Sequence, residues 1–87
     1  MKEREPLKAK IHITLKAGIL DPQGKTIHHA LDMLGFGGIS EVRTGKFMEL
    51  LFDGVSYEQA RQLTENACKK LLSNPIMESF HFTLVQA

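Results

Sequence analysis

Residues Leu7 to Leu15 alternate strictly between apolar and polar side chains, and this pattern constrains the fold more than any other feature. Every second position of the nine-residue segment is apolar, and the positions between carry Lys8, Lys10, His12 and Thr14. A period of two places the apolar set on one face of an extended strand. Because that face must be buried, the strand is predicted to lie in a sheet covered on one side.

A helix is predicted soon after this strand. Asp21 can accept hydrogen bonds from the first free N–H groups, and Pro22 suits the first helical position because no donor is needed there. The apolar residues that follow at helical spacing are Ile27, Ala30, Leu31 and Leu34. Gly35 is expected to end the helix, since glycine readily adopts the left-handed conformation found after helix C-termini.

The segment from Ser40 to Phe52 reads as strand and allows two interpretations. In the first, Thr44-Gly45 turns a tight hairpin between two short strands. In the second, one long strand runs through and is bent by a bulge at Gly45. We favour the long strand, because the Asn-Gly or Asp-Gly pair typical of two-residue turns is absent. Both faces of this strand then carry large apolar side chains. We therefore expect both faces to be buried, one of them against a partner chain.

A second helix is predicted to start at Ser56, because Gln59 stands three residues later, at the spacing of a capping box. Its predicted inner stripe is Ala60, Leu63, Ala67 and Leu71. Asn74-Pro75 ends this helix. A final strand is expected from about Met77 to Val85, with Phe80, Phe82 and Leu84 on one face.

The predicted order is therefore strand, helix, one or two strands, helix, strand. Both helices are apolar along one side only, so we expect both on one face of a mainly antiparallel sheet, in an α+β, ferredoxin-like two-layer sandwich. Residues 7–87 form the single domain, and residues 1–6 a flexible N-terminal tail. At 87 residues a monomer buries only about 60–65% of its unfolded surface, which favours association.

Composition excludes several classes of protein. The formal net charge of +1 is far from the basic balance of a dedicated nucleic-acid binder. The single cysteine, Cys68, cannot form a disulfide framework or a cysteine zinc site, and it fits a reducing cytosol. Neither a signal peptide nor an apolar run long enough to span a bilayer is evident. We therefore expect a cytoplasmic protein with no membrane or nucleic-acid partner.

The residues predict no catalytic or metal-binding constellation. His28 and His29 are adjacent on a helix and point about 100° apart, so they cannot bind one metal ion together. His12 and His81 can be cross-strand neighbours, but no carboxylate or thiolate stands near them in sequence. Cys68 has no base beside it and reads as a small buried apolar group.

Three motifs occur in order along the chain. They are Leu20-Asp21-Pro22-Gln23-Gly24-Lys25, Leu34-Gly35-Phe36 and Val42-Arg43-Thr44-Gly45-Lys46. Their combination resembles the PurS family, the small subunit of phosphoribosylformylglycinamidine (FGAM) synthase. The likeness is nearly co-linear from about Leu7 to the C-terminus.

The resemblance implies a function that composition does not show. In this family a glutaminase (PurQ-like) subunit frees ammonia from glutamine. A synthetase (PurL-like) subunit uses ATP and Mg to convert formylglycinamide ribonucleotide to the amidine in de novo purine biosynthesis. The small subunit, a homodimer or tetramer, bridges the two and supports ammonia transfer. The chain would thus belong to an ATP-dependent C–N ligase while holding no catalytic residue, metal or cofactor itself.

The same resemblance supplies candidate contact residues. The matching motifs give the partner-contact candidates, which are Asp21, Gln23, Lys25, Arg43 and Lys46. The apolar strand gives the self-association candidates, which are Phe47, Met48 and Leu51. An alternative function is a stand-alone, ferredoxin-like regulatory dimer that binds a small ligand, and it rests on fold analogy alone.

Overall fold

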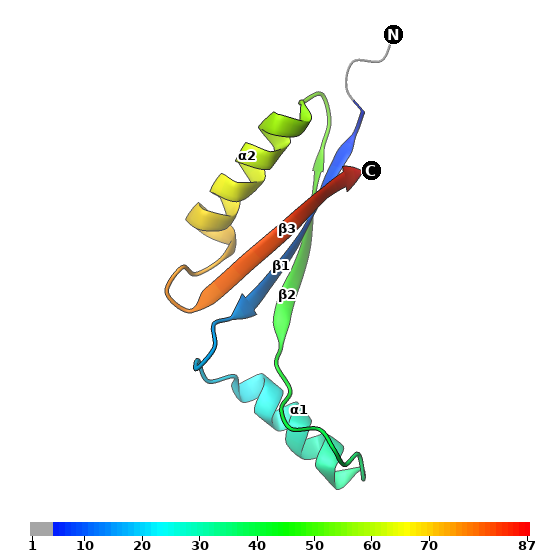
Figure 1. Cartoon of the computed structure of the whole chain (residues 1–87), viewed down its shortest axis with the longest axis vertical. Coiled ribbons are helices and arrows are strands. Elements are labelled where there is room, and N and C mark those ends of the chain that lie inside the picture. Colours follow the sequence, from blue (N-terminus) through cyan, green and yellow to red (C-terminus); the bar gives the residue numbers. More distant parts are fainter. Residues whose placement is uncertain (1–4) are drawn as a thin grey trace.

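The computed structural model describes residues 5–87, with three strands and two α-helices in that part of the chain (Figure 1). The elements are β1 (Leu7–Leu15), α1 (Pro22–Met33), β2 (Gly45–Phe52), α2 (Tyr57–Ala67) and β3 (Glu78–Gln86). A π-helical turn, η1 (Cys68–Leu72), continues α2. Most of the predicted tail lies outside the described residues, and the Pro6 carbonyl accepts a hydrogen bond from the Ala87 N–H at 3.0 Å.

The three strands form an antiparallel sheet in the order β2-β1-β3, with β1 in the middle (Figure 1). Ile11 of β1 stands opposite Met48 of β2 and Phe82 of β3. The apolar face predicted from the alternation is buried, and its innermost members are Ala9, Ile11 and Ile13. The prediction of a half-buried strand over Leu7–Leu15 is therefore confirmed.

β2 is a single strand that begins at Gly45, so the hairpin interpretation is wrong. The favoured long strand is also shorter than predicted, since residues 40–44 form no strand. A side chain at Gly45 would bring its Cβ to 2.6 Å from the Ile13 carbonyl oxygen. Glycine is needed here because the backbones of β1 and β2 approach each other closely.

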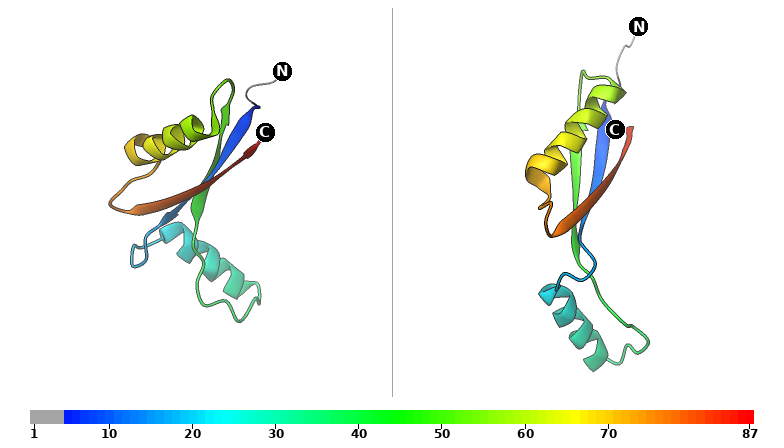
Figure 2. Two further views of the ribbon diagram at one scale, coloured as in Figure 1. Left: turned by 45° about the horizontal axis from the view of Figure 1, so that its top comes forward. Right: turned by 60° about the vertical axis from the view of Figure 1, so that its left-hand side comes forward.

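α2 covers one side of the sheet and starts at the predicted capping box (Figure 2). The Ser56 Oγ accepts from the Gln59 N–H at 3.1 Å, and the Gln59 Oε1 accepts from the Ser56 N–H at 3.0 Å. These reciprocal bonds satisfy two of the free donors at the helix start.

The buried stripe of α2 differs from the predicted one. Ala60, Thr64 and Cys68 are fully buried, whereas Leu63 and Leu71 are exposed. The prediction that Leu63 and Leu71 face the core is therefore wrong, because the buried positions follow Ala60 at steps of four residues and include a polar side chain, Thr64. Thr64 can enter the core because its hydroxyl donates to the Ala60 carbonyl at 2.8 Å, which leaves no unsatisfied polar atom.

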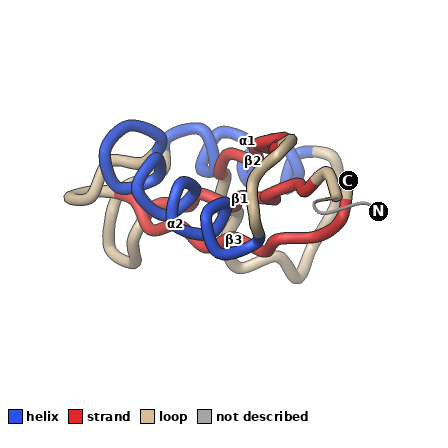
Figure 3. Tube along the Cα trace, turned by 90° about the horizontal axis from the view of Figure 1, so that it is seen from above, coloured by secondary structure: helices blue, strands red, loops and turns tan. Residues whose placement is uncertain are grey.

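α1 does not lie on the sheet but projects beyond the end of it (Figures 1 and 2). Its ends are as predicted, with Asp21 at the N-cap and Gly35 at a φ of +92° after the C-terminus. Within residues 5–87 it makes no extensive contact with a strand or with α2. The chain therefore measures 58 × 27 × 14 Å, and Figure 3 views it down the long axis.

The α+β class and the antiparallel sheet are thus confirmed, but among the elements of residues 5–87 α2 alone forms the helical layer on this sheet. An amphipathic pattern indicates that a helix needs cover, and it does not indicate which chain supplies that cover.

Candidate functional site: the junction between the sheet and α1

The matching motifs meet where α1 joins the sheet. The segment after β1 carries Asp21 and Gly24, and the segment before β2 carries Arg43 and Thr44. Asp21 and Thr44 are 23 positions apart in sequence and in direct contact. We call these four residues the junction.

Asp21 is the centre of the junction. The residue is only 3% exposed. One carboxylate oxygen accepts from the Gly24 N–H at 2.8 Å, and the other from the Thr44 N–H at 2.6 Å. The Thr44 hydroxyl donates to the same carboxylate at 3.0 Å. The bonds from the backbone N–H groups of Thr44 and then Gly24 lower the pKa of Asp21, because they stabilise the ionised carboxylate.

Arg43 also links the segment before β2 to the segment after β1. Its guanidinium donates to the Ile19 carbonyl at 3.0 Å and to the Lys16 carbonyl at 3.2 Å. The Glu41 carboxylate forms an ion pair with the same guanidinium at 3.5 Å. A planar guanidinium suits this role because it can donate in several fixed directions.

Gly24 explains why its motif contains a glycine. A Cβ at this position would stand 2.2 Å from the Val42 carbonyl oxygen and 3.0 Å from the Asp21 carboxylate carbon. No side chain fits between the first turn of α1 and the segment before β2. Sequence reasoning identified Asp21 as a cap but missed Gly24 and Thr44, whose roles depend on contacts between distant segments.

The five partner-contact candidates therefore divide into two groups. Asp21 and Arg43 hold the junction together, so their polar groups are largely occupied inside the chain. Gln23, Lys25 and Lys46 are exposed around it, and the Lys46 ammonium lies 3.4 Å from a Glu78 carboxylate oxygen. That contact with partner subunits uses these side chains stays a prediction.

Two shallow hollows flank the junction. One of about 390 Å³ includes Lys25, His28 and Arg43 in its lining. The other, of about 420 Å³, includes Gln23, Lys46 and Glu78. The exposed candidates thus contribute to the lining of concave surfaces.

The self-association candidates lie on two faces of β2. Met48 points to the α2 side and packs on the core, whereas Phe47 and Leu51 are exposed on the opposite face. There the Phe47 ring lies 4.9 Å from the His12 ring, which stacks on His81 at 5.1 Å. The predicted neighbourhood of His12 and His81 is confirmed.

Catalytic or metal chemistry finds little support in the described part of the chain. Within residues 5–87 no three His, Cys, Asp or Glu side chains are grouped so as to hold a metal ion. Cys68 is buried, and burial raises the pKa of its thiol, so the nucleophilic thiolate is disfavoured. The absence of a catalytic group stays a prediction.

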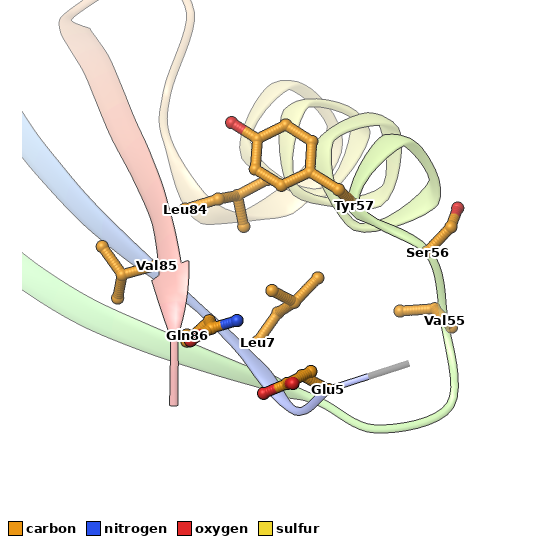
Figure 4. Close-up of a pocket in the computed structure, with 8 residues that line it drawn as sticks. All are labelled: Glu5, Leu7, Val55, Ser56, Tyr57, Leu84, Val85 and Gln86. Carbon is orange, nitrogen blue, oxygen red and sulfur yellow. The ribbon is translucent and has the colours of Figure 1, made fainter. Parts of the chain in front are cut away.

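A third hollow, of about 400 Å³, lies at the end of the sheet remote from α1 (Figure 4). Leu7, Val55, Tyr57 and Leu84 give it a largely apolar wall, and Glu5 stands at its edge. Sequence reasoning missed it because its residues come from both ends of the domain and from the start of α2.

Comparisons with known proteins decide the family. The family model "PurS: Phosphoribosylformylglycinamidine (FGAM) synthase" matches residues 8–86. The chain belongs to the PurS family. The phosphoribosylformylglycinamidine synthase subunit PurS of Methanocaldococcus jannaschii is 41% identical over 73 residues, which are 84% of this chain and 88% of that protein. The PurS subunit of Bacillus subtilis is 36% identical over 75 residues, 86% of this chain and 88% of that one.

Solved structures of PurS proteins share the fold. The M. jannaschii PurS crystal structure, one of the subunits of formylglycinamide ribonucleotide amidotransferase, superposes with a TM-score of 0.82 at 36% identity, covering 93% of this chain and 98% of that one. The structure of PurLQS from Thermotoga maritima contains a chain with a TM-score of 0.84 at 26% identity, covering 94% and 100%. The PurS resemblance expected from the three motifs is confirmed.

Within residues 5–87 no helix has the length and apolar character that crossing a bilayer requires.

Proposed function

We propose that this chain is the PurS subunit of a phosphoribosylformylglycinamidine synthase and that it joins the glutaminase subunit to the synthetase subunit. The complex converts formylglycinamide ribonucleotide to its amidine with ATP and glutamine, a step of purine biosynthesis. The observation that carries the proposal is family membership over residues 8–86, together with the likeness to a chain of the T. maritima PurLQS structure.

The geometry supports an assembly role better than a catalytic one. The Asp21 carboxylate and the Arg43 guanidinium are committed to bonds that fix α1 to the sheet. These bonds hold the exposed Gln23, Lys25 and Lys46 in place around the junction. Rigid presentation of surface side chains lowers the entropy cost of docking, because fewer groups must be ordered on binding.

A bridging subunit also has a chemical purpose. Ammonia released into neutral water is mostly protonated and loses its nucleophilic lone pair. A complex that keeps the glutaminase and synthetase sites connected without bulk water avoids this loss. In our proposal ATP and Mg act in the synthetase subunit, this chain binds no cofactor, and the complex works in the cytoplasm.

Co-elution tests the assembly role. The chain is mixed with synthetase and glutaminase subunits from the same source, with Mg-ADP and glutamine present, and separated by size. We expect one ternary species that contains all three chains and is lost when this chain is omitted. Assembly of the other two subunits without it would overturn the bridging role.

A further inference from the structure

The face of the sheet opposite α2 carries a row of three aromatic rings. His12 of β1 stands directly opposite Phe47 of β2 and His81 of β3. All three residues are exposed. The His12 ring lies in the middle of the row, 4.9 Å from the Phe47 ring and 5.1 Å from the His81 ring. The strand register therefore places side by side two imidazoles that are far apart in the sequence.

The ring nitrogens of His12 and His81 are available for binding. Within residues 5–87 neither imidazole takes part in a hydrogen bond or an ion pair, and both make ring contacts alone. By contrast, the Nε2 atom of His28 lies 2.7 Å from the Ile39 carbonyl oxygen. Imidazole nitrogen is a favoured ligand of zinc, copper and nickel ions. The pair thus offers two unused ligands to a metal ion of this class.

The separation of the two rings suits one shared ion. Zinc lies about 2.0–2.1 Å from a histidine nitrogen, so two nitrogens that share a zinc ion are at most about 4 Å apart. The ring centres of His12 and His81 are 5.1 Å apart, and the ring planes are within 12° of parallel. Because both side chains are exposed, small rotations about their side-chain bonds tilt the nitrogens toward each other at little cost.

The row of residues on one side of the pair leaves room for a hydrated ion. It holds only small residues, which are Gly45, Thr14 and Ser79. An ion held by two protein ligands needs water in its remaining coordination positions. Small side chains beside the pair give these water molecules space.

The charges on the other side of the pair partly cancel. The cations of β1 nearest to His12 on this face are Lys8 and Lys10. The Glu49 carboxylate lies 3.6 Å from the Lys8 ammonium, and Glu49 stands opposite Lys10 in the register. This carboxylate offsets part of the repulsion that the two lysines exert on a bound cation.

We propose that His12 and His81 together bind one divalent transition-metal ion, for which Zn²⁺ is the probe. Each imidazole supplies one nitrogen, and water fills the other positions. Two imidazoles are fewer than the three or four protein ligands of a tight zinc site, so the ion exchanges with the solution. It joins β1 to β3 and takes no part in the reaction proposed above. The inference rests on the geometry of the histidine pair and does not depend on the proposed function.

Zinc titration of the full, untagged chain tests the site. Isothermal titration calorimetry with ZnCl₂ is expected to show saturable binding of one ion per chain. His12→Gln and His81→Gln should each weaken binding about tenfold or more, because the ion then loses its second, intramolecular contact. His29→Gln, which removes an exposed histidine of α1, is the matched control and should leave the affinity unchanged. MgCl₂ should not displace the zinc, since Mg²⁺ prefers oxygen ligands.

Two further measurements distinguish a shared ion from separate surface ligands. Long-range ¹H–¹⁵N spectra of the wild type should show, on addition of ZnCl₂, a shift of one ring nitrogen in His12 and of one in His81. Zinc should also raise the Tm of the wild type but not of either variant. Both variants should keep the wild-type circular dichroism spectrum, because the two side chains are exposed.

Three results would overturn the proposal. They are the absence of saturable zinc binding, a shift in only one of the two rings, and an unchanged affinity in His12→Gln or in His81→Gln. A loss of affinity in His29→Gln as large as in the other two variants would likewise place the zinc elsewhere.

Discussion

The Thr44 backbone N–H donates to the Asp21 carboxylate at 2.6 Å, across 23 positions of sequence. This bond joins the start of α1 to the segment that leads into β2. Since α1 has no extensive contact with the sheet in its own chain, the junction determines where the helix points.

Asp21→Ala is expected to destabilise the protein more than loss of an ordinary N-cap would. The substitution leaves the Gly24 and Thr44 N–H groups without their acceptor. We expect the Tm to fall by about 5–10 °C, measured by circular dichroism. Gln23→Ala, an exposed neighbour in the same turn, should leave it within about 2 °C. Equal small effects of both substitutions would contradict a special role for Asp21.

Gly24→Ala is expected to disturb the junction through backbone contact. Its Cβ would stand 2.2 Å from the Val42 carbonyl oxygen, so the two segments must separate. We expect a loss of about 1–3 kcal/mol in the free energy of unfolding, obtained from urea denaturation. Gly37→Ala is the matched control, because a Cβ there meets nothing within 4 Å. A neutral Gly24→Ala would show that the close approach is not needed.

Acid is expected to weaken the junction. The pKa of Asp21 lies below its ordinary value of 3.8, chiefly through the Thr44 backbone bond. A carboxylate with a lowered folded-state pKa contributes stability above its unfolded pKa and loses it as pH falls through the folded value. The Asp21 contribution should therefore begin to decline near pH 4 and be lost only when the pH has fallen below the lowered pKa of the folded state. Denaturation curves of Asp21→Asn should then be less pH-dependent than wild type between about pH 5 and 2.

The core of the sheet is expected to depend on the inner face of β1. Ile11 is fully buried between β2 and β3. Ile11→Ala should cost about 2–5 kcal/mol in the free energy of unfolding. Thr14→Ala, on the exposed face of the same strand, should change it by less than about 1 kcal/mol. Similar costs at both positions would contradict the assigned faces.

Docking is expected to depend on the exposed side chains around the junction. Lys25→Glu with Lys46→Glu reverses two charges in the lining of the flanking hollows. We expect the double variant to keep its circular dichroism spectrum and to weaken co-elution with the synthetase and glutaminase subunits at least tenfold. Lys70→Glu, a charge reversal on η1, is the control. Full assembly by the double variant would exclude these residues as docking contacts.

Local patterns predicted the parts of the fold that depend on neighbouring residues. The alternation of β1, the Asp21 cap and the Ser56–Gln59 capping box each involve residues a few positions apart. The position of α1 could not be predicted in this way. Its apolar stripe shows that it needs cover, but the restraint that holds it off the sheet comes from Thr44, far away in sequence.

The candidate site was predictable to a similar extent. Motif likeness identified Asp21 and Arg43, but their occupied polar groups became evident only from the contacts between segments. Gly24 carries no side chain and so gives no chemical signal, although the close approach of the Val42 carbonyl requires it. Thr64 was passed over for the core because its hydroxyl has a local acceptor that side-chain polarity alone does not reveal.

In our proposal this chain assembles a synthase without taking part in its chemistry. The most direct measurement compares amidine formation by the synthetase and glutaminase subunits with and without this chain, supplied with glutamine or with ammonium. We predict that glutamine-dependent formation requires this chain, whereas ammonium-dependent formation by the synthetase does not. Equal glutamine-dependent rates with and without the chain would contradict the account, as would an ammonium-dependent reaction that needs it.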